Sequence, residues 1–106
     1  MKEELIPHIK IKIAISLNRL LDASKRFRPI NNKEEEIAKS YNKIALAAYI
    51  RKATVSDIFN AKSKTAPNTA TLLLIIEGMG YNLNDFAIVY DSVIEADIIE
   101  FEQLRK

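Results

Sequence analysis

The chain has 106 residues but no cysteine, only two glycines and three prolines, and a single histidine. The absence of cysteine excludes disulfide bonds and thiolate zinc sites, and it favours an intracellular protein. Because glycine and proline are scarce, a turn-rich all-β fold is disfavoured and helices are expected. The length predicts one domain.

Reactive groups are equally scarce. His8 is the only histidine, and neither a nucleophile–base pair nor a metal-ligand cluster accompanies it. Catalysis by acid–base or nucleophilic chemistry needs such groups within reach of one another. We therefore expect no enzymatic activity, no cofactor and no metal. A small-molecule ligand is not expected either, because the chain has no second domain large enough for a ligand pocket.

The chain also lacks long hydrophobic runs. Its longest apolar segments fall far short of the ~20 residues that a membrane span needs. The first ten residues, MKEELIPHIK, contain no apolar segment typical of a signal peptide. We expect a cytoplasmic protein that does not bind a membrane.

Charge is present but unevenly distributed. Residues 1–66 hold 14 Lys and Arg against 7 Asp and Glu, a net charge of +7, whereas residues 67–106 hold 2 against 7, a net charge of −5. This asymmetry indicates a basic surface for a polyanion and an acidic surface for another contact. Chance clustering on solvated faces is the alternative.

The first expected helix covers Ile6 to Phe27, with Pro7 in its first turn and Pro29 beyond its end. The segment from Ile9 to Ile13 also alternates with a period of two, as a strand would. The helical spacing continues to Leu21, beyond the length of a typical strand, and therefore decides for a helix. The apolar stripe consists of Ile9, Ile13, Leu17, Leu20 and Leu21.

A second apolar stripe, from Ile37 to Ala48, predicts a helix that extends back to Lys33. Asn32 and Glu35 have the spacing of a capping box at its start. Residues 49–51 are predicted to form a turn, followed by a helix over residues 52–60. The inward side of this helix is predicted to hold Val55, Ile58 and Phe59.

Three further helices are expected. The first begins at Pro67 or Asn68, runs to Glu77 and ends at Gly78-Met79-Gly80, because glycine readily adopts a left-handed C-cap. The second lies around residues 85–90, with Asn82 or Asn84 as its N-cap. The third is the acidic tail, residues 91–106, whose apolar stripe contains Ile94, Ile98 and Phe101.

Two helices joined by a turn of three to four residues are the geometry that places one helix in a DNA major groove. Residues 40–86 resemble the phage-repressor and Cro-type (Xre-like) helix-turn-helix family of transcriptional regulators. The motif residues that match are Ile44, Ala45, Ala48, Thr54, Val55, Ser56, Ile58, Lys62 and Pro67, and segments 71–75 and 80–86 match the family's closing helices.

The resemblance implies an all-α, five-helix lambda-repressor-like domain over residues 1–90, with the helix-turn-helix motif at 41–61 and an extended first motif helix. Residues 91–106 would form an extra C-terminal helix. Three positions depart from the family pattern. Tyr49 and Ala61 stand where glycines are usual, so both are expected to need unusual backbone angles. Phe59 stands where a glutamate is frequent, and we expect it to pack against residues 13–21.

The resemblance further implies sequence-specific binding of double-stranded DNA, as a repressor, with helix 52–60 in the major groove. The base-reading candidates are Arg51, Lys52, Ala53, Ser56 and Asp57. The phosphate-binding candidates are Tyr41, Lys43, Thr54, Asn60, Lys62 and Lys64. Arg51 and Lys52 are alternatively phosphate contacts, Thr54 a cap, and Asp57 either a reader of cytosine or a partner of Lys43.

Relatives usually bind palindromic operators as two-fold dimers. A homodimer is therefore expected, with Ile94, Ile98 and Phe101 as the dimer face, unless these residues pack on their own domain. The rival function is a protein-interaction module, antitoxin-like or an adaptor, that is derived from the same motif and binds DNA weakly or not at all.

Overall fold

The structure, a computed structural model, describes residues 2–25 and 33–104, and it describes side chains at residues 8–24 and 40–104. Within these ranges the chain is all-helical, as expected. The proposed capping pair of Asn32 and Glu35 lies outside the described side chains. The helices are α1 (Lys2–Lys25), α2 (Lys33–Ala48), α3 (Lys52–Phe59), α4 (Thr69–Gly78), α5 (Leu83–Ser92) and α6 (Glu95–Leu104).

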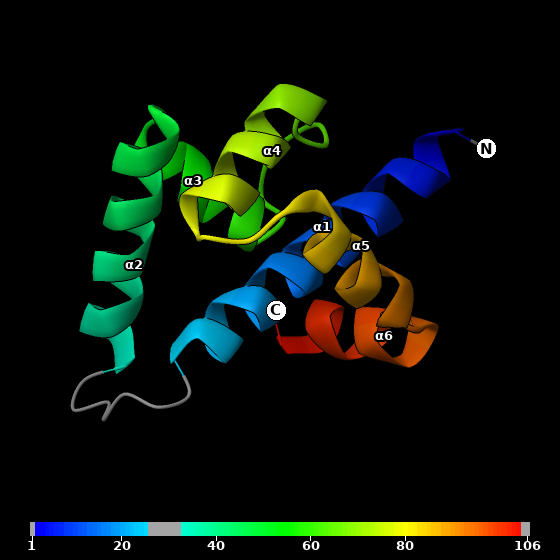
Figure 1. Cartoon of the computed structure of the whole chain (residues 1–106). Helices are drawn as coiled ribbons and strands as arrows, with labels where there is room; N and C mark the ends of the chain where they lie inside the picture. Colours follow the sequence, from blue (N-terminus) through cyan, green and yellow to red (C-terminus); the bar gives the residue numbers. More distant parts are fainter. Residues whose placement is uncertain (1, 26–32, 105–106) are drawn as a thin grey trace.

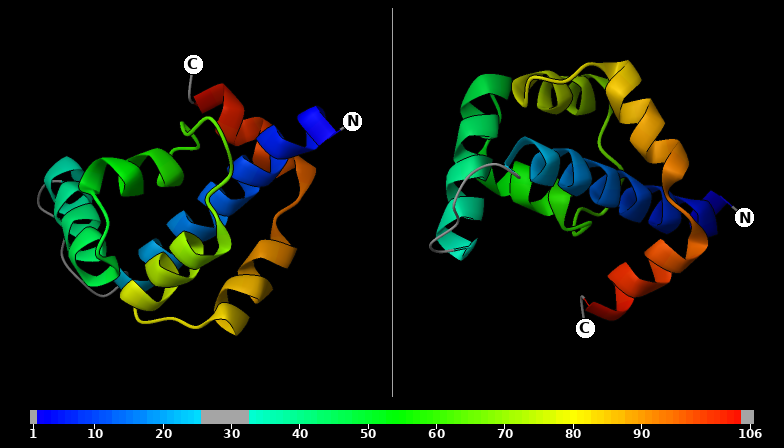
Figure 2. Two further views of the ribbon diagram at one scale, coloured as in Figure 1. Left: turned by 90° about the horizontal axis from the view of Figure 1, so that it is seen from above. Right: turned by 60° about the horizontal axis from the view of Figure 1, so that its bottom comes forward.

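Helix α1 is the central element. It packs against α3, α5 and α6, while α2 packs against α3 and α4. Figures 1 and 2 show α1 as a long rod through the molecule, with α2 near its C-terminal end and α6 alongside it. Because α1 touches helices on several sides, its sequence must be apolar around much of its circumference.

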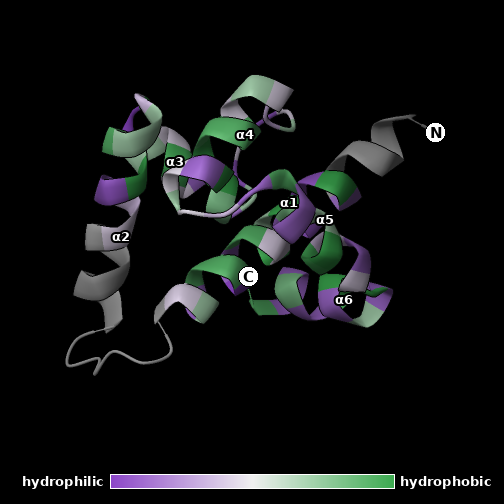
Figure 3. Cartoon of the chain, viewed as in Figure 1, coloured by the Kyte–Doolittle hydropathy of each residue, from purple (hydrophilic) through white to green (hydrophobic). Residues whose placement is uncertain are grey.

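Two apolar faces of α1 serve two separate clusters. Ile13, Leu17, Leu20 and Leu21 belong to the main core. Ile11, Ala14 and Ile15 form a second cluster with Ala61 and Val93, against which Ile98 and Phe101 pack. Ile11, Ile13 and Ile15 thus alternate between two buried faces of α1, whereas Ile9, expected in the apolar stripe, is 39% exposed. Figure 3 shows hydrophobic residues recurring along α1.

Three helix ends share one backbone motif. A residue one or two positions past each of α2, α3 and α4 has a positive φ: Tyr49 at 58°, Ala61 at 55° and Gly80 at 89°. In each case the next amide donates to the carbonyl five residues earlier, the longer bond of a Schellman motif. These bonds run from Ile50 to Ala45 at 3.0 Å, from Lys62 to Asp57 at 2.8 Å and from Tyr81 to Ile76 at 3.1 Å.

The predicted backbone strain at Tyr49 and Ala61 is therefore confirmed, and only Gly80 meets this requirement without a Cβ. The other glycine, Gly78, serves a different purpose. A Cβ at Gly78 would lie 3.3 Å from the Cβ of Ala47, so the glycine permits the close approach of α4 to α2.

Replacing Tyr49 with glycine should raise the free energy of unfolding by about 1 kcal/mol. The left-handed conformation costs about 1–2 kcal/mol for a residue with a Cβ, and glycine removes this cost. Part of the gain is offset because glycine loses more conformational entropy on folding. The Tyr49 side chain is 92% exposed, so little packing is lost. Urea denaturation measures the change. Tyr49→Ala keeps the Cβ and is the matched control; an equal gain in both variants would rule out backbone strain as the cause.

Several boundaries differ from the expectation. Helix α1 begins at Lys2, which places Pro7 in its second turn, and α3 ends at Phe59 instead of Asn60. Helix α5 extends to Ser92, so the division expected after residue 90 falls inside a helix. Val93, the residue after α5, is 6% exposed and belongs to the second cluster of α1, so it ties the tail to the domain.

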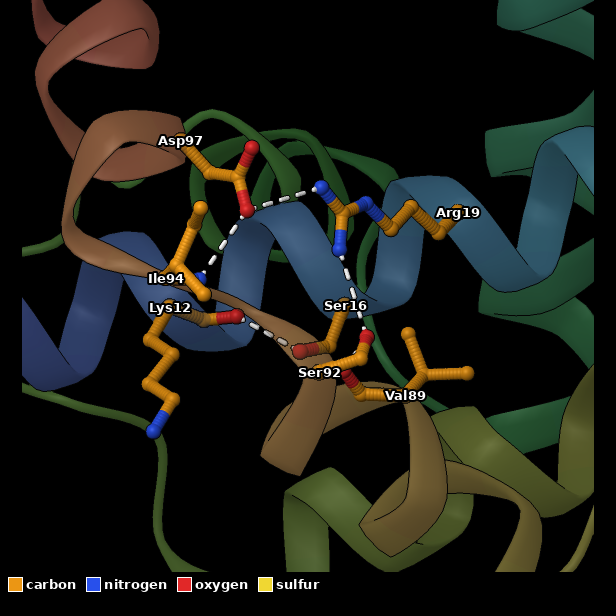
Figure 4. A network of polar contacts seen from close by, with 7 residues as sticks. All are labelled: Lys12, Ser16, Arg19, Val89, Ser92, Ile94 and Asp97. Atoms are coloured by element: carbon orange, nitrogen blue, oxygen red, sulfur yellow. Dashed lines mark hydrogen bonds and ion pairs between the residues drawn. The ribbon is translucent and has the colours of Figure 1, made fainter.

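The junction of α5 and α6 is fastened to α1 by a small polar network (Figure 4). The Arg19 guanidinium lies 3.2 Å from the Asp97 carboxylate and 3.4 Å from the Ser92 hydroxyl. Asp97 also accepts a hydrogen bond of 3.0 Å from the backbone amide of Ile94. These contacts hold the first turn of α6 against α1.

This network predicts a pH-dependent contribution to stability. The amide of Ile94 first, and then Arg19, lower the pKa of Asp97. A carboxyl whose folded pKa is depressed stabilises the fold above its unfolded pKa of about 4, and this contribution is lost as pH falls through the folded value.

The stability difference between the wild type and Asp97→Asn should therefore shrink below about pH 4. Denaturation curves at several pH values test this, with Glu102→Gln, an exposed residue of α6, as control. A difference that stays constant with pH would contradict the prediction.

No helix among the described residues is long and apolar enough to cross a membrane by itself. Helices α4 and α5 satisfy the criteria of length and composition only as a pair, and the pair is bent by 102°.

Candidate nucleic-acid interface

Helix α3 is held from one side. Val55, Ile58 and Phe59 are buried, as predicted, and belong to the core cluster that contains Leu17 and Leu21 of α1. The Phe59 ring lies 5.1 Å from the ring of Tyr41 on α2. The Phe59 carbonyl accepts a hydrogen bond of 2.8 Å from the side-chain amide of Asn18. These contacts fix the orientation of α3, and the opposite side of the helix faces solvent.

The base-reading candidates lie on that outward side. Arg51, Lys52, Ala53 and Asp57 are exposed, and Thr54 and Ser56 are partly exposed. Lys52 and Ser56 are one turn apart, as are Ala53 and Asp57, so they form two adjacent rows along the helix. The structure thus brings the five predicted residues onto one exposed strip.

The N-terminus of α3 is open. Arg51 is the N-cap residue, and no side chain caps the helix. Its carbonyl accepts from the amides of Thr54 and Val55, which leaves the amides of Lys52 and Ala53, the first two of the helix, without a partner in the helix. Unpartnered amides and the helix dipole together favour an anion at this end. The predicted capping role for Thr54 is therefore not observed.

The phosphate-binding candidates divide into two groups. Lys43, Lys62 and Lys64 are exposed and available to an anion. Tyr41 is only 8% exposed, and burial is the main cause that raises the pKa of its hydroxyl, which is hydrogen-bonded to Asn60.

Tyr41 is a core residue, and its contact with a phosphate stays a prediction. Because α2 begins at Lys33, Tyr41 lies in the middle of a helix and not at an open N-terminus. Asn60 is also occupied: its side-chain amide donates to the Ser56 carbonyl at 2.8 Å. It closes the end of α3 and links α3 to Tyr41.

Asp57 lacks the partner suggested for it. Both Asp57 and Lys43 are exposed, and no ion pair joins them; among the described residues the ion pair found is Arg19–Asp97. Asp57 therefore presents a free carboxylate on the same strip as Lys52.

Lys10 makes a contact that the sequence did not indicate. Its ammonium group donates to the backbone carbonyls of Ser63 at 2.7 Å and Lys64 at 3.4 Å. These partners are more than fifty residues away along the chain. Every residue has a backbone carbonyl, so no residue type or spacing in the sequence could have indicated the contact.

The residues expected to form a dimer face are separated by the structure. Ile98 and Phe101 pack against the second cluster of α1, whereas Ile94 is 60% exposed. Ile98 and Phe101 therefore pack on their own domain, which was the alternative to a dimer face.

Within the described ranges, no group of three or more His, Cys, Asp or Glu side chains is placed to hold a metal ion. Comparison of the chain with family models, with curated proteins and with solved structures finds no match in any of the three.

Proposed function

We propose that the chain is a sequence-specific DNA-binding protein of lambda-repressor-like architecture that acts in the cytoplasm as a small transcriptional repressor. The observation that carries this proposal is the outward strip of α3. It contains polar and charged side chains, begins at an uncapped helix terminus and is followed by the exposed lysines Lys62 and Lys64.

The chemistry of the strip suits base edges in a major groove. Arg51 and Lys52 can donate to O6 and N7 of guanine, Ala53 can contact the methyl group of thymine, and Asp57 can accept from N4 of cytosine. The unpaired carboxylate of Asp57 is unfavourable beside phosphates, so its presence favours direct reading of a base. Lys43, Lys62 and Lys64 would hold the phosphate backbone and set the register.

Binding of the wild type to duplex DNA should weaken steeply with salt, because each neutralised phosphate contributes about 0.9 to the slope of log affinity against log salt. Selection of bound sequences from a random duplex pool tests binding, palindromy and half-site spacing together. A response that is flat with salt, or no binding at low salt, would refute the proposal.

Lys52→Ala should cost about 1–3 kcal/mol of binding free energy and change the selected sequence if Lys52 reads a base. Asn84→Ala, at an exposed position of α5, is the control and should select the wild-type sequence. If Lys52→Ala weakens binding equally for all sequences, Lys52 contacts phosphate instead.

We further propose a homodimer on a palindromic site, because one recognition helix spans few base pairs. Ile94, Ile99 and Leu104, 60%, 50% and 79% exposed, are the large apolar residues of the tail left free by its packing on α1. Ile94→Lys should shift sedimentation toward the monomer without loss of folding. An unchanged dimer would remove Ile94 from the interface.

The second candidate function is a protein-interaction module. It is favoured by Leu46 and Tyr49, which are 78% and 92% exposed and lie one turn apart at the end of α2. A mobility-shift assay with random duplex at low salt separates the two functions, since an interaction module would not retard DNA.

A further inference from the structure

The loop between α3 and α4 carries Lys62 and Lys64, and its two ends are fixed by hydrogen bonds to the adjoining helices. At one end the Lys62 amide donates to the Asp57 carbonyl at 2.8 Å. At the other, the Asn68 side chain caps α4 by accepting from the Thr71 amide at 2.8 Å. Between them, no amide of residues 63–66 donates to a backbone carbonyl of the described chain. The middle of the loop must therefore be held by side chains.

The side chain that holds it is Lys10. Its ammonium group hydrogen-bonds the Ser63 carbonyl at 2.7 Å and approaches the Lys64 carbonyl at 3.4 Å. Charge-assisted hydrogen bonds of this kind are stronger than neutral ones. The next residue, Ile11, shares a cluster with Ala61 at the start of the loop, so α1 and the loop meet at adjacent points.

The contact places the positively charged Lys10 beside a loop that carries two more lysines. Lys10 lies against the backbone of a loop whose lysines, Lys62 and Lys64, are exposed. No carboxylate of the described residues lies within ion-pair distance of any of the three; the ion pair found is on Arg19. Lysines on one surface without a counter-charge favour contact with an external polyanion.

We propose that Lys10 is a positioning residue for phosphate binding: it holds the α3–α4 loop in the form that presents Lys62 and Lys64 to the phosphates of one DNA strand. This inference rests on the proposed DNA-binding function. Lys10 acts through the loop, since its own ammonium group is occupied by backbone carbonyls.

The test is a double-mutant cycle in the full chain, measured on a duplex selected by the wild type and over a range of salt concentrations. Lys10→Met retains an unbranched stem but removes the donor, and Lys10→Arg retains donors. The second axis of the cycle is the pair Lys62→Ala and Lys64→Ala. Lys10→Met should lower the salt slope by about 0.9–1.8, the equivalent of one or two lost phosphate contacts, and Lys10→Arg should restore it.

The decisive result is the lack of additivity. When Lys62 and Lys64 are already alanine, Lys10→Met should change neither the affinity nor the salt slope, because it acts through those lysines. Equal effects in the two backgrounds would show that Lys10 contacts DNA itself or acts elsewhere, and would overturn the inference. An unchanged slope for Lys10→Met alone would do the same.

A readout without DNA separates this inference from the proposed function. Trypsin cleaves after lysine, so release of the loop in Lys10→Met should accelerate cleavage after Lys62 and Lys64 several-fold relative to the wild type and to Lys10→Arg. Unchanged cleavage overturns the inference even if wild-type DNA binding is demonstrated. If the wild type binds no duplex at low salt, the DNA-binding proposal falls, and the phosphate-positioning role falls with it.

Discussion

Phe59→Ala is expected to lower the free energy of unfolding by about 3–5 kcal/mol, the range for truncation of a buried phenylalanine. Phe59 is 0% exposed and is among the largest fully buried side chains. It lies at the end of α3 and joins that helix to Tyr41 of α2 and to the α1 side of the core. Because small domains are stable by about 5–15 kcal/mol, this loss would leave a large fraction of molecules unfolded at raised temperature.

Urea denaturation, followed by circular dichroism, measures the effect. Phe59→Leu is the matched control and should lose much less, because an apolar side chain of similar volume still fills the site. If the alanine and leucine variants lose the same amount, the ring contact with Tyr41 matters more than the filled volume. A loss below 1 kcal/mol for alanine would contradict the burial of Phe59.

Removal of residues 92–106 should destabilise the domain by several kcal/mol. The deletion takes away Val93, Ile98 and Phe101, which cover Ile11 and Ile15 of α1, and full burial of one such side chain contributes about 1.5–3 kcal/mol. It also removes Asp97 and leaves Arg19 without its ion pair. The thermal midpoint of the shortened chain is the measurement.

This expectation changes how a dimer must be tested. A shortened chain that fails to dimerise could do so because its core is exposed, whereas Ile94→Lys leaves the second cluster intact. If the shortened chain melts at the wild-type temperature, α6 contributes little to the fold and its apolar side is free for a partner.

Local features were predictable because they depend on nearby residues. The turn at residues 49–51, the helix that follows it and the burial of Val55, Ile58 and Phe59 all follow from apolar spacing over one or two turns. The positive φ angles at Tyr49 and Ala61 were expected because the family resemblance places these residues where glycines are usual. The exposure of Lys52 and Asp57 followed from the same periodicity, since both residues lie on the side of the helix opposite the buried residues.

Other features depend on which elements meet. Helical spacing identifies an apolar stripe on the tail, but it does not say whether that stripe contacts a second chain or α1. The structure shows that Ile98 and Phe101 cover α1 and that Tyr41 is part of the core. It also shows that the alternating isoleucines of α1 serve two clusters.

The sequence by itself determined helices across the described residues and an exposed, charged strip on α3 formed by Arg51, Lys52, Ala53 and Asp57, because both depend on spacing within a few turns. Only the tertiary structure decided what covers the second face of α1 and what holds the loop after α3. These are contacts between residues far apart in the chain, such as Lys10 with Ser63, and they depend on the packing of helices and on backbone carbonyls that every residue possesses.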